Sequence, residues 1–252
     1  MDDERSFLVK RFTELAEQAV TEYRYRYTEF LSLYELSVFH EMERELSYAS
    51  PVAFGGCESA ERCMVRFGSE ESCGYAEEFP ISMLEVKPSM EKYAQKLTHR
   101  DFLGSVLGLG LERTKIGDIF IRESTACLFV NESVEDYILA NLTYVNRTKV
   151  KVSKLDEMPE SLRPVLVAKS VLVSSNRLDS IIAKFYGLSR DEALRLVKVG
   201  NVFVDGRQVS KNAAELQTGQ IVSVRGHGRF VFDEPGNTTR KDKVYVNLRV
   251  YS

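Results

Sequence analysis

The order of short apolar segments between residues 81 and 152 constrains the fold of this chain most strongly. Segments of strand length alternate with segments of helical periodicity, and turn residues separate them. The order strand, helix, strand, strand, helix, strand is typical of a ferredoxin-like or RRM-like sheet that carries its helices on one face. The predicted segments are residues 81–86, 101–107, 118–121, 127–130, 134–142 and 149–152.

A typical RRM exposes aromatic side chains on its central strands, where they stack on RNA bases. The strand predicted at residues 127–130 offers only Phe129 for this purpose, and the strand at residues 81–86 has no aromatic residue. We therefore expect that this middle domain does not stack bases on its sheet. It would serve instead as a spacer or as a protein-binding unit.

The preceding segment is predicted to form one or two amphipathic helices over residues 7–46, which contain neither Gly nor Pro and are rich in helix formers. A strand is predicted at residues 63–67. The alternation of Tyr and Arg in residues 23–27 suits stacking on nucleic-acid bases, but we favour a buried helix face beside a solvated one. The aromatic residues that recur at helical spacing are Tyr23, Tyr27, Phe30 and Tyr34.

The last third of the chain opens with two short helices whose ends are marked in the sequence. Asn176 is a favourable N-cap for the first helix, and Gly187 can end it. Ser189 and Glu192 have the spacing of a capping box for the second helix, which Gly200 can end. The two helices are therefore predicted to follow each other almost directly.

A small sheet is predicted after these helices. The pair Asp205-Gly206 predicts a tight hairpin turn, because Gly supplies the positive φ that such a turn requires. The tail at residues 244–251 alternates like a strand and is expected to pair with one of the two sheets. The other strands are predicted at residues 202–204, 207–209 and 221–225.

Charge divides the chain into an acidic and a basic part. Residues 1–162 hold 19 Lys and Arg against 29 Asp and Glu, a net charge of −10, whereas residues 163–252 hold 15 against 8, a net charge of +7. Such an asymmetry is expected where one domain meets phosphate and the rest does not. It could equally serve solubility, so charge alone does not decide between the two.

Basic residues of the two predicted helices are expected to form a single cationic surface. Cations beside helix N-termini suit phosphate, because free backbone N–H groups and the helix dipole add to the side-chain charge. Arg177, Arg190 and Lys198 are the principal candidates for phosphate contacts. The full set of predicted RNA-binding residues is Arg177, Lys184, Ser189, Arg190, Lys198, Asn201, Arg207, Lys211, Arg225 and Arg229.

Several short runs of residues in this region match, in identity and order, those of a known RNA-binding domain. They are Arg177-Leu178-Asp179, Ser189-Arg190, Lys198-Val199-Gly200, the segment from Val202 to Gly206 and the segment from Val222 to Gly226. About 60 residues closely resemble the domain named after ribosomal protein S four, found also in pseudouridine synthases and tyrosyl-tRNA synthetases. Asp205 departs from that family, which more often has Asn there. Asp permits the turn but makes the loop less favourable to phosphate.

Further runs extend the resemblance to about residues 80–232. They are the segment from Leu97 to Gly104, Gly108-Leu109-Gly110, the segment from Lys115 to Ile119, Leu162-Arg163-Pro164 and the segment from Arg225 to Phe230. Together they look like the YlmH family. Its members are bacterial cytoplasmic proteins implicated in ribosome-associated quality control, where they bind the large subunit with peptidyl-tRNA, and they are also linked to cell division. The resemblance implies the same class of function here.

Motifs that resemble catalytic sites do not have the residues that catalysis requires. His99-Arg100-Asp101 imitates a kinase catalytic loop, but Val106 stands where the metal-binding Asn belongs. Gly108-Leu109-Gly110 has Arg113 where a dinucleotide fingerprint requires Gly. We therefore assign no catalytic residue and expect that the protein is not an enzyme.

Four cysteines and three histidines match no zinc spacing, so we expect no metal, no cofactor, and reduced, mostly buried thiols. No apolar run reaches the ~18 residues that a membrane span needs, and the first ten residues lack the order of a secretory signal. We therefore expect a cytoplasmic protein that has no membrane partner and is a monomer.

Together these features predict an α+β protein with N-terminal helices, a ferredoxin-like or RRM-like βαββαβ middle domain and a small C-terminal α/β RNA-binding domain with an αL motif. The expected function is to dock structured RNA of the large ribosomal subunit, tRNA or both. The alternatives are an RNA-modifying enzyme with a cryptic site in the middle domain, and a structural partner of division or membrane proteins. The expected parts are residues 1–78 (helical segment with a short strand), 79–155 (middle domain), 156–172 (linker), 173–235 (RNA-binding domain) and 236–252 (tail strand).

Overall fold

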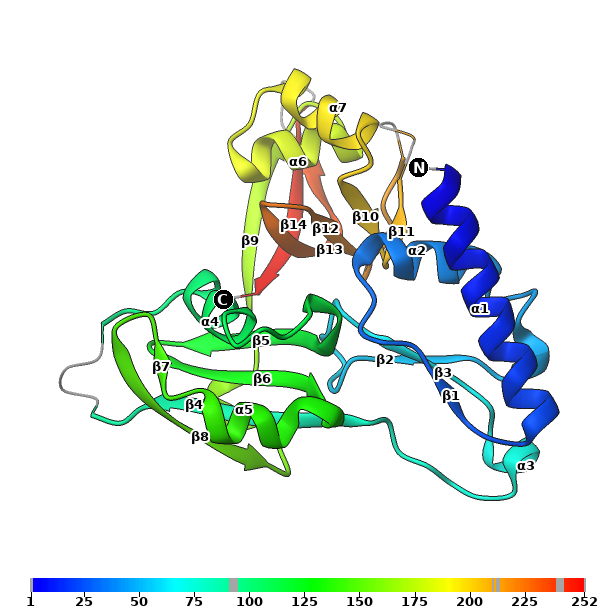
Figure 1. Cartoon of the computed structure of the whole chain (residues 1–252). Coiled ribbons are helices and arrows are strands. Elements are labelled where there is room, and N and C mark those ends of the chain that lie inside the picture. Colours follow the sequence, from blue (N-terminus) through cyan, green and yellow to red (C-terminus); the bar gives the residue numbers. More distant parts are fainter. Residues whose placement is uncertain (1, 91–94, 210, 212–213, 239–242, 252) are drawn as a thin grey trace. The chain divides into compact units, whose positions relative to one another are not determined.

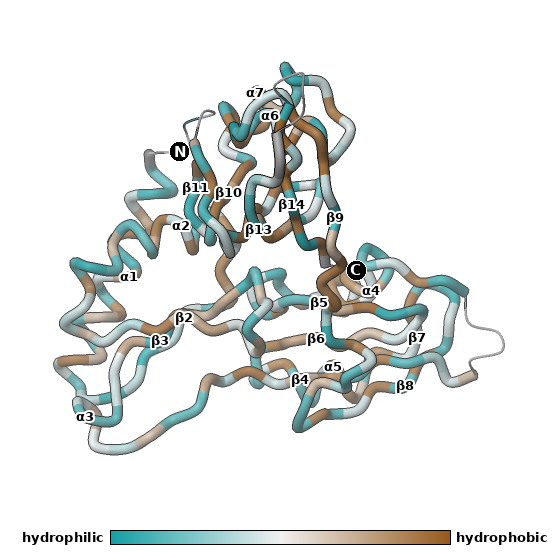
Figure 2. The backbone as a smooth tube through the Cα atoms, turned by 180° about the vertical axis from the view of Figure 1, so that it is seen from behind, coloured by the Kyte–Doolittle hydropathy of each residue, from teal (hydrophilic) through white to brown (hydrophobic). Residues whose placement is uncertain are grey.

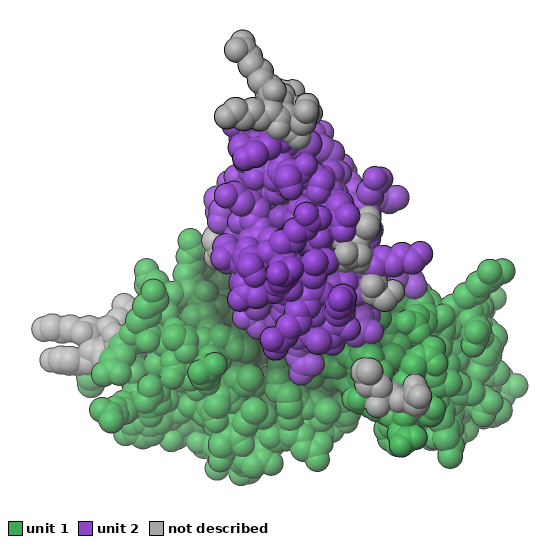
Figure 3. All heavy atoms as spheres, turned by 90° about the horizontal axis from the view of Figure 1, so that it is seen from above, with its two compact units in different colours: residues 1–163 green, residues 164–252 purple. Residues whose placement is uncertain are grey.

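The computed structural model of the protein describes residues 2–90, 95–209, 211, 214–238 and 243–251. The described residues divide between two compact units, residues 1–163 and 164–252 (Figure 3). Each unit combines helices with antiparallel sheet (Figure 1), so the predicted α+β class is confirmed. The boundary expected between residues 78 and 79 lies inside the first unit.

The N-terminal part of the first unit begins with the long helix α1 and continues with a small sheet of strand order β1-β3-β2. Ser32 caps α2 by a capping box with Glu35. The strand predicted at residues 63–67 is confirmed as β3. The elements are α1 (Asp2–Glu22), β1 (Arg26–Tyr27), α2 (Leu33–Met42), η1 (Ser47–Ala49), β2 (Val52–Phe54), β3 (Met64–Phe67) and α3 (Glu70–Cys73).

The predicted buried helix face of four aromatic residues is wrong. The first helix ends at Glu22, Tyr23 has a positive φ of 54°, and the last two residues of the alternating run, Arg26 and Tyr27, form β1, which pairs with β3. The alternation of Tyr and Arg has the two-residue period of a strand, and in the fold this segment pairs with β3. Tyr23 is exposed and Phe30 is completely buried, although neither lies in a helix.

The middle of the first unit is the predicted split βαβ sheet. Its strand order is β5-β6-β4-β8-β7, which places the first strand, β4, between β6 and β8, and every pair is antiparallel. All six predicted segments are confirmed as elements. They are β4 (Ile81–Pro88), α4 (His99–Leu107), β5 (Ile116–Arg122), β6 (Thr125–Asn131), α5 (Glu135–Asn141) and β8 (Thr148–Leu155), with β7 (Tyr144–Val145), η3 (Arg113–Lys115), η4 (Glu132–Val134) and η5 (Glu160–Leu162) between or after them.

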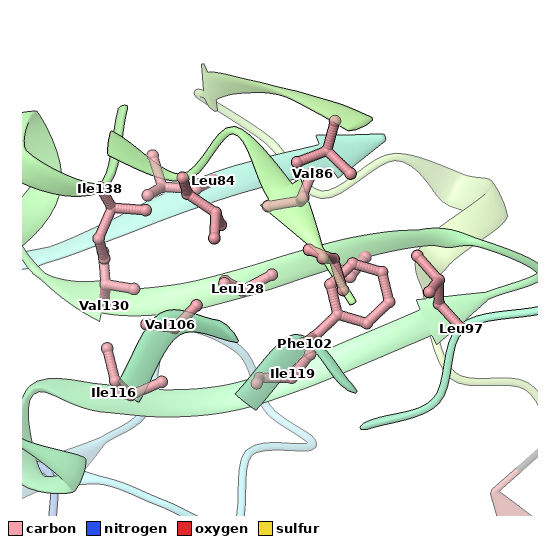
Figure 4. Packing of buried hydrophobic residues seen from close by; sticks show 14 of the residues in the cluster. Leu84, Val86, Leu97, Phe102, Val106, Ile116, Ile119, Leu128, Val130 and Ile138 are labelled. Atoms are coloured by element: carbon pink, nitrogen blue, oxygen red, sulfur yellow. The ribbon is translucent and has the colours of Figure 1, made fainter. Parts of the chain in front are cut away.

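The helices α4 and α5 cover one face of this sheet. Leu84 and Leu128 from the central strands meet Phe102 and Val106 from α4 and Ile138 from α5 (Figure 4). All five side chains are completely buried. Because burial of one such side chain contributes about 1.5–3 kcal/mol, this cluster is a main source of stability in the unit.

The second face of the sheet is partly covered by the N-terminal part of the same unit. Phe129 is only 2% exposed and packs in a cluster with Phe30 and Met64. Gly117 permits this approach, since a Cβ atom there would lie 2.7 Å from the Phe30 ring. Arg62 fastens the contact, because its guanidinium donates hydrogen bonds to the carbonyl oxygens of Phe30 and Ile116. Phe129, the only aromatic residue of the central strands β4 and β6, is therefore a core residue.

The second unit places α6 and α7 on one face of an antiparallel sheet with the strand order β11-β10-β12-β13-β14-β9 (Figure 1). Ile181, Ile182, Ala193 and Val197 from the two helices are buried against Phe230 and other residues of the sheet. The elements are β9 (Leu166–Val173), α6 (Leu178–Tyr186), α7 (Arg190–Lys198), β10 (Val202–Val204), β11 (Arg207–Gln208), β12 (Ile221–Val224), β13 (Gly228–Thr238) and β14 (Val244–Tyr251).

The linker prediction is wrong for residues 166–172, which form most of β9. This strand is largely apolar (Figure 2) and pairs with β14 along its whole length, from Leu166 opposite Tyr251 to Val173 opposite Val244. The predicted tail strand is therefore confirmed as β14, and its partners are β9 and β13. The prolines nearest to this segment, Pro159 and Pro164, both precede β9.

The helix ends in the second unit follow the sequence with one exception. Ser189 forms the predicted capping box with Glu192, and Gly187 ends α6 with a φ of 69°. Asp205 and Gly206 have φ values of 49° and 73°, as the hairpin turn requires. The predicted N-cap is wrong, because Arg177 occupies that position, and the side-chain oxygen of Asn176 is buried without a hydrogen bond.

All four cysteines are free, with Cys127 buried and the others half-buried. None of the helices in the described ranges is long and apolar enough to cross a membrane.

Candidate nucleic-acid interface

A buried carboxylate organises the start of the helix pair. Asp179 lies in the first turn of α6 and is completely buried. Its Oδ1 accepts a hydrogen bond of 3.0 Å from Nε of Arg177, and its Oδ2 accepts one of 3.3 Å from Nε of Arg190. A second nitrogen of Arg177 donates to Oδ2 at 3.4 Å. One carboxylate thus holds two guanidinium groups, and the local net charge is positive.

The two arginines remain accessible although their partner does not. The side chain of Arg177 is 37% exposed and that of Arg190 is 58% exposed. Each guanidinium has five N–H donors, so the few hydrogen bonds to Asp179 leave donors that can reach an external anion. The planar guanidinium geometry suits bidentate binding of phosphate oxygens. The arrangement therefore presents two oriented, solvent-accessible guanidinium groups, a chemistry that suits phosphate.

A shallow groove of about 420 Å³ lies beside this pair. Lys184 from α6 and Arg190 from α7 both line it, together with the hydroxyl-bearing Ser174 and Ser180. Lys184 is exposed. The fold therefore brings together Arg177, Arg190 and Lys184, which come from two helices.

The other predicted residues lie at different places on the same unit. Lys198 is exposed at the end of α7, about 12 Å along the helix from Arg190. Asn201 follows that helix, and its carbonyl oxygen accepts a hydrogen bond from the backbone N–H of Arg225. Lys211 and Arg225 are exposed, Arg207 is exposed on β11, and Arg229 is half-buried on β13.

Ser189 has a structural partner. Its hydroxyl donates to the Glu192 carboxylate at 2.7 Å and accepts from the Glu192 backbone N–H at 3.2 Å. The Ser189 hydrogen bonds lower the pKa of Glu192, and Arg195 and His227 also attract that carboxylate. The predicted contact of Ser189 with RNA stays a prediction, whereas its capping interaction is observed.

Sequence reasoning missed two features of this surface. The first is Asp179, although it stands in the Arg-Leu-Asp run and is the only acid in the first turn of α6. The second is an aromatic contact between Tyr186 and His227, whose ring centroids lie 5.4 Å apart. His227 is exposed in the turn between β12 and β13, next to Arg225. The run Gly226-His227-Gly228 was a signal, because an imidazole between two glycines is held in a tight exposed turn.

The second unit is thus a small antiparallel sheet with two short helices, whose exposed residues include Lys184, Arg190 and Lys198. The model of the S4 domain matches residues 176–222, and a model described as a putative RNA-binding domain in YlmH matches residues 75–158. The chain is 30% identical over 251 residues to ribosome-associated protein quality control protein P2 of Bacillus subtilis (strain 168), covering 98% of this chain and 95% of that protein. The chain therefore belongs to the YlmH family of bacterial RNA-binding proteins.

A solved structure is also similar. It is the cell division protein ylmH from Streptococcus pneumoniae, with a TM-score of 0.46 and 21% identity, covering 60% of this chain and 91% of that one.

Within the described ranges, no three His, Cys, Asp or Glu side chains are placed to hold a metal ion. His99, Arg100 and Asp101 open α4, where Asp101 accepts hydrogen bonds from the backbone and hydroxyl of Thr98. Asp101 therefore caps a helix, and the resemblance to a kinase loop ends there.

Proposed function

We propose that the protein is a non-enzymatic factor that docks on structured RNA of the large ribosomal subunit, on tRNA, or on both, through the helix pair α6–α7. The observation that carries the proposal is the buried Asp179, which holds Arg177 and Arg190 in place while both remain open to solvent. Burial of the Asp179 charge carries a desolvation penalty, and in return two guanidinium groups are oriented to bind phosphate. Lys184 adds a third cation beside them.

The name of the Bacillus subtilis relative supports the ribosomal part of the proposal, since that protein is described as ribosome-associated and as a quality-control protein. A protein that docks on ribosomes acts in the cytoplasm, and we propose that this chain does so as a monomer. Double-stranded ribosomal RNA is recognised mostly through its shape and phosphates, which suits a surface of arginine and lysine. The link to cell division stays a prediction.

The test uses a variant in which the charge of the helix-pair surface is changed while the buried Asp179 carboxylate keeps one arginine partner. Reversing Arg177 and Arg190 together would surround Asp179 with acids and unfold the module. We therefore choose Lys184→Glu, Arg190→Gln and Lys198→Glu, which keep Arg177 on Asp179. A matched control carries Lys10→Glu, Arg11→Gln and Arg44→Glu, the same charge change on exposed N-terminal residues.

Both proteins are sedimented with purified bacterial large ribosomal subunits over a range of salt concentrations. We expect the surface variant to lose about tenfold or more in affinity and to show a salt dependence shallower by about two units, because three phosphate contacts are lost. The control should bind like the natural chain. Unchanged binding by a folded surface variant would overturn the proposal. Altered nucleosides in RNA incubated with the protein would favour the RNA-modifying alternative.

A further inference from the structure

The second face of the β5-β6-β4-β8-β7 sheet is covered at one end and open at the other. At the covered end, Met83 and Phe129 pack with Phe30 from the N-terminal part. Side chains alternate along a strand, so Lys87, four residues after Met83 on β4, lies on the same face as Met83. Lys87 is exposed. The face therefore changes along β4 from an apolar core to an open polar surface.

Three lysines and a tyrosine meet on the open end. Lys87 of β4 is directly opposite Lys151 of β8, and Lys149 of β8 is directly opposite Tyr144 of β7. The antiparallel partners lie about 4.5–5.5 Å apart, so the four side chains form one continuous patch. All four are exposed, Tyr144 by 54%. We call Lys87, Lys149, Lys151 and Tyr144 the sheet-end patch.

The patch holds positive charge that the fold does not neutralise. Like charges directly opposite on paired strands are destabilising, yet Lys87 faces Lys151. Glu85 pairs with Lys87 at 2.7 Å, but Lys149 and Lys151 make no ion pair among the described residues. Several other cations of this unit have carboxylate partners. They include Arg5 with Glu41, Arg26 with Glu22, Lys115 with Glu29 and Lys154 with Glu135.

This excess is notable because its unit is acidic overall, with a net charge of −10 over residues 1–162. Two unpaired lysines in one patch of an acidic unit create a local site of opposite potential. The patch also lacks the apolar centre that a stable protein interface needs, since its one large nonpolar surface is the Tyr144 ring. Cations around a single exposed aromatic ring are typical of surfaces that follow a nucleic-acid backbone.

We propose that the sheet-end patch is a second RNA-contact surface, in which Lys87, Lys149 and Lys151 bind consecutive phosphates and the Tyr144 ring stacks on a base or packs on a ribose. The proposal deepens the proposed function and rests on it, because RNA is the ligand of both surfaces. It differs from RRM binding, since the central aromatic Phe129 is buried and the contact lies at the end of the sheet. The matched putative RNA-binding domain at residues 75–158 spans all four residues.

The test uses the full chain with Lys87→Gln, Lys149→Gln and Lys151→Gln. A matched control carries Lys10→Gln, Arg11→Gln and Arg44→Gln, three exposed cations of the same unit. Lys87→Gln relieves the repulsion from Lys151 but also leaves Glu85 without its partner. The double variant Lys149→Gln and Lys151→Gln keeps the Glu85–Lys87 pair, is measured beside the triple variant, and should unfold at the same midpoint as the natural chain or above it. A loss of binding would then not come from a loss of fold.

Binding is measured to purified bacterial large ribosomal subunits and, separately, to poly(U) as a single-stranded probe. We expect the patch variant to lose about fivefold to tenfold in affinity for the subunits, with a salt dependence shallower by about two units, and the control to lose less than twofold. Tyr144→Leu should weaken binding with an unchanged salt dependence, because it removes stacking and no charge.

Two outcomes separate this proposal from the proposed function. If the Lys184, Arg190 and Lys198 variant loses binding while the patch variant binds normally, the patch proposal is overturned and the proposed function stands. If only the patch variant loses binding, the patch proposal stands and the helix pair is not the docking surface. Competition by polyglutamate at concentrations where RNA does not compete would identify an acidic protein as the ligand and overturn the patch proposal.

Discussion

Replacing Asp179 with Asn tests whether this buried carboxylate organises the helix pair. The change keeps the size of the side chain and removes its charge. Removing one partner of a buried ion pair costs about 3–5 kcal/mol when the remaining charge stays buried. Here the remaining guanidinium groups are 37% and 58% exposed and can be hydrated, so the penalty is smaller. A hydrogen bond to a charged group contributes about 1.5–3 kcal/mol, and the 3.0 Å contact with Arg177 is the shortest of the three.

We therefore expect Asp179→Asn to lower the free energy of unfolding of residues 164–252 by about 2–3 kcal/mol. The chain has no Trp, so pulsed hydrogen–deuterium exchange read by mass spectrometry along a urea titration is the suitable assay. Peptides from α6, α7 and β12 report this unit alone. The control is Asp191→Asn, the same change at an exposed acid in the first turn of α7. A loss of less than about 0.5 kcal/mol, equal to that of the control, would refute the role of Asp179.

Three further predictions concern other parts of the molecule. Gly117→Ala should destabilise the first unit by about 1–3 kcal/mol, because the new Cβ would lie 2.7 Å from the Phe30 ring; Gly104→Ala, which meets nothing within 4 Å, should not, and equal thermal melting of the two variants would contradict the argument. Burial raises the pKa of the Cys63 and Cys127 thiols to about 12, so iodoacetamide at pH 8 should leave both unmodified until the protein unfolds, and rapid alkylation of either in the folded chain, seen by mass spectrometry, would count against the packing. The Ser189 hydrogen bonds hold the pKa of Glu192 below its ordinary value of 4.5; the stabilisation is therefore present above pH 4.5 and is lost as the pH falls through the lower folded pKa. In Glu192→Gln, the free energy of unfolding, measured by urea titration, should fall less on acidification than in the natural chain. An unchanged dependence of that free energy on pH would exclude the capping interaction as the cause of the acid-induced loss.

Local signals in the sequence predicted most of the fold. Turn residues and apolar periodicity located the six elements of the βαββαβ order, although not the edge strand β7. Ser189 with Glu192 located the start of α7, because caps and turns depend on residues close in the chain. The errors arose where pairing with a segment distant in the sequence decides the local structure. Tyr27 has the pattern of a helix face but pairs with β3, and residues 166–172 form a strand because β14, almost 80 residues later, pairs with them.

The candidate site shows the same division. Spacing along α6 and α7 identified Arg177, Lys184 and Arg190, and the fold does place them together. The pairing of both arginines with one buried acid could not be predicted, because burial of Asp179 depends on how α7 packs against α6. The opposition of Lys87 and Lys151 was also hidden, since it requires the register between two strands more than 60 residues apart. The alternating lysines at 149 and 151 on a predicted strand were the available signal.

The central claim, that the helix pair of the second unit meets ribosomal RNA, is tested most directly by ultraviolet crosslinking of the full chain to RNA in cells, followed by sequencing of the bound RNA and mass spectrometry of the crosslinked peptides. We expect crosslinked peptides within residues 177–198 and reads from ribosomal RNA of the large subunit or from tRNA. Crosslinks that avoid residues 177–198, or reads spread over messenger RNA without ribosomal RNA or tRNA, would contradict it.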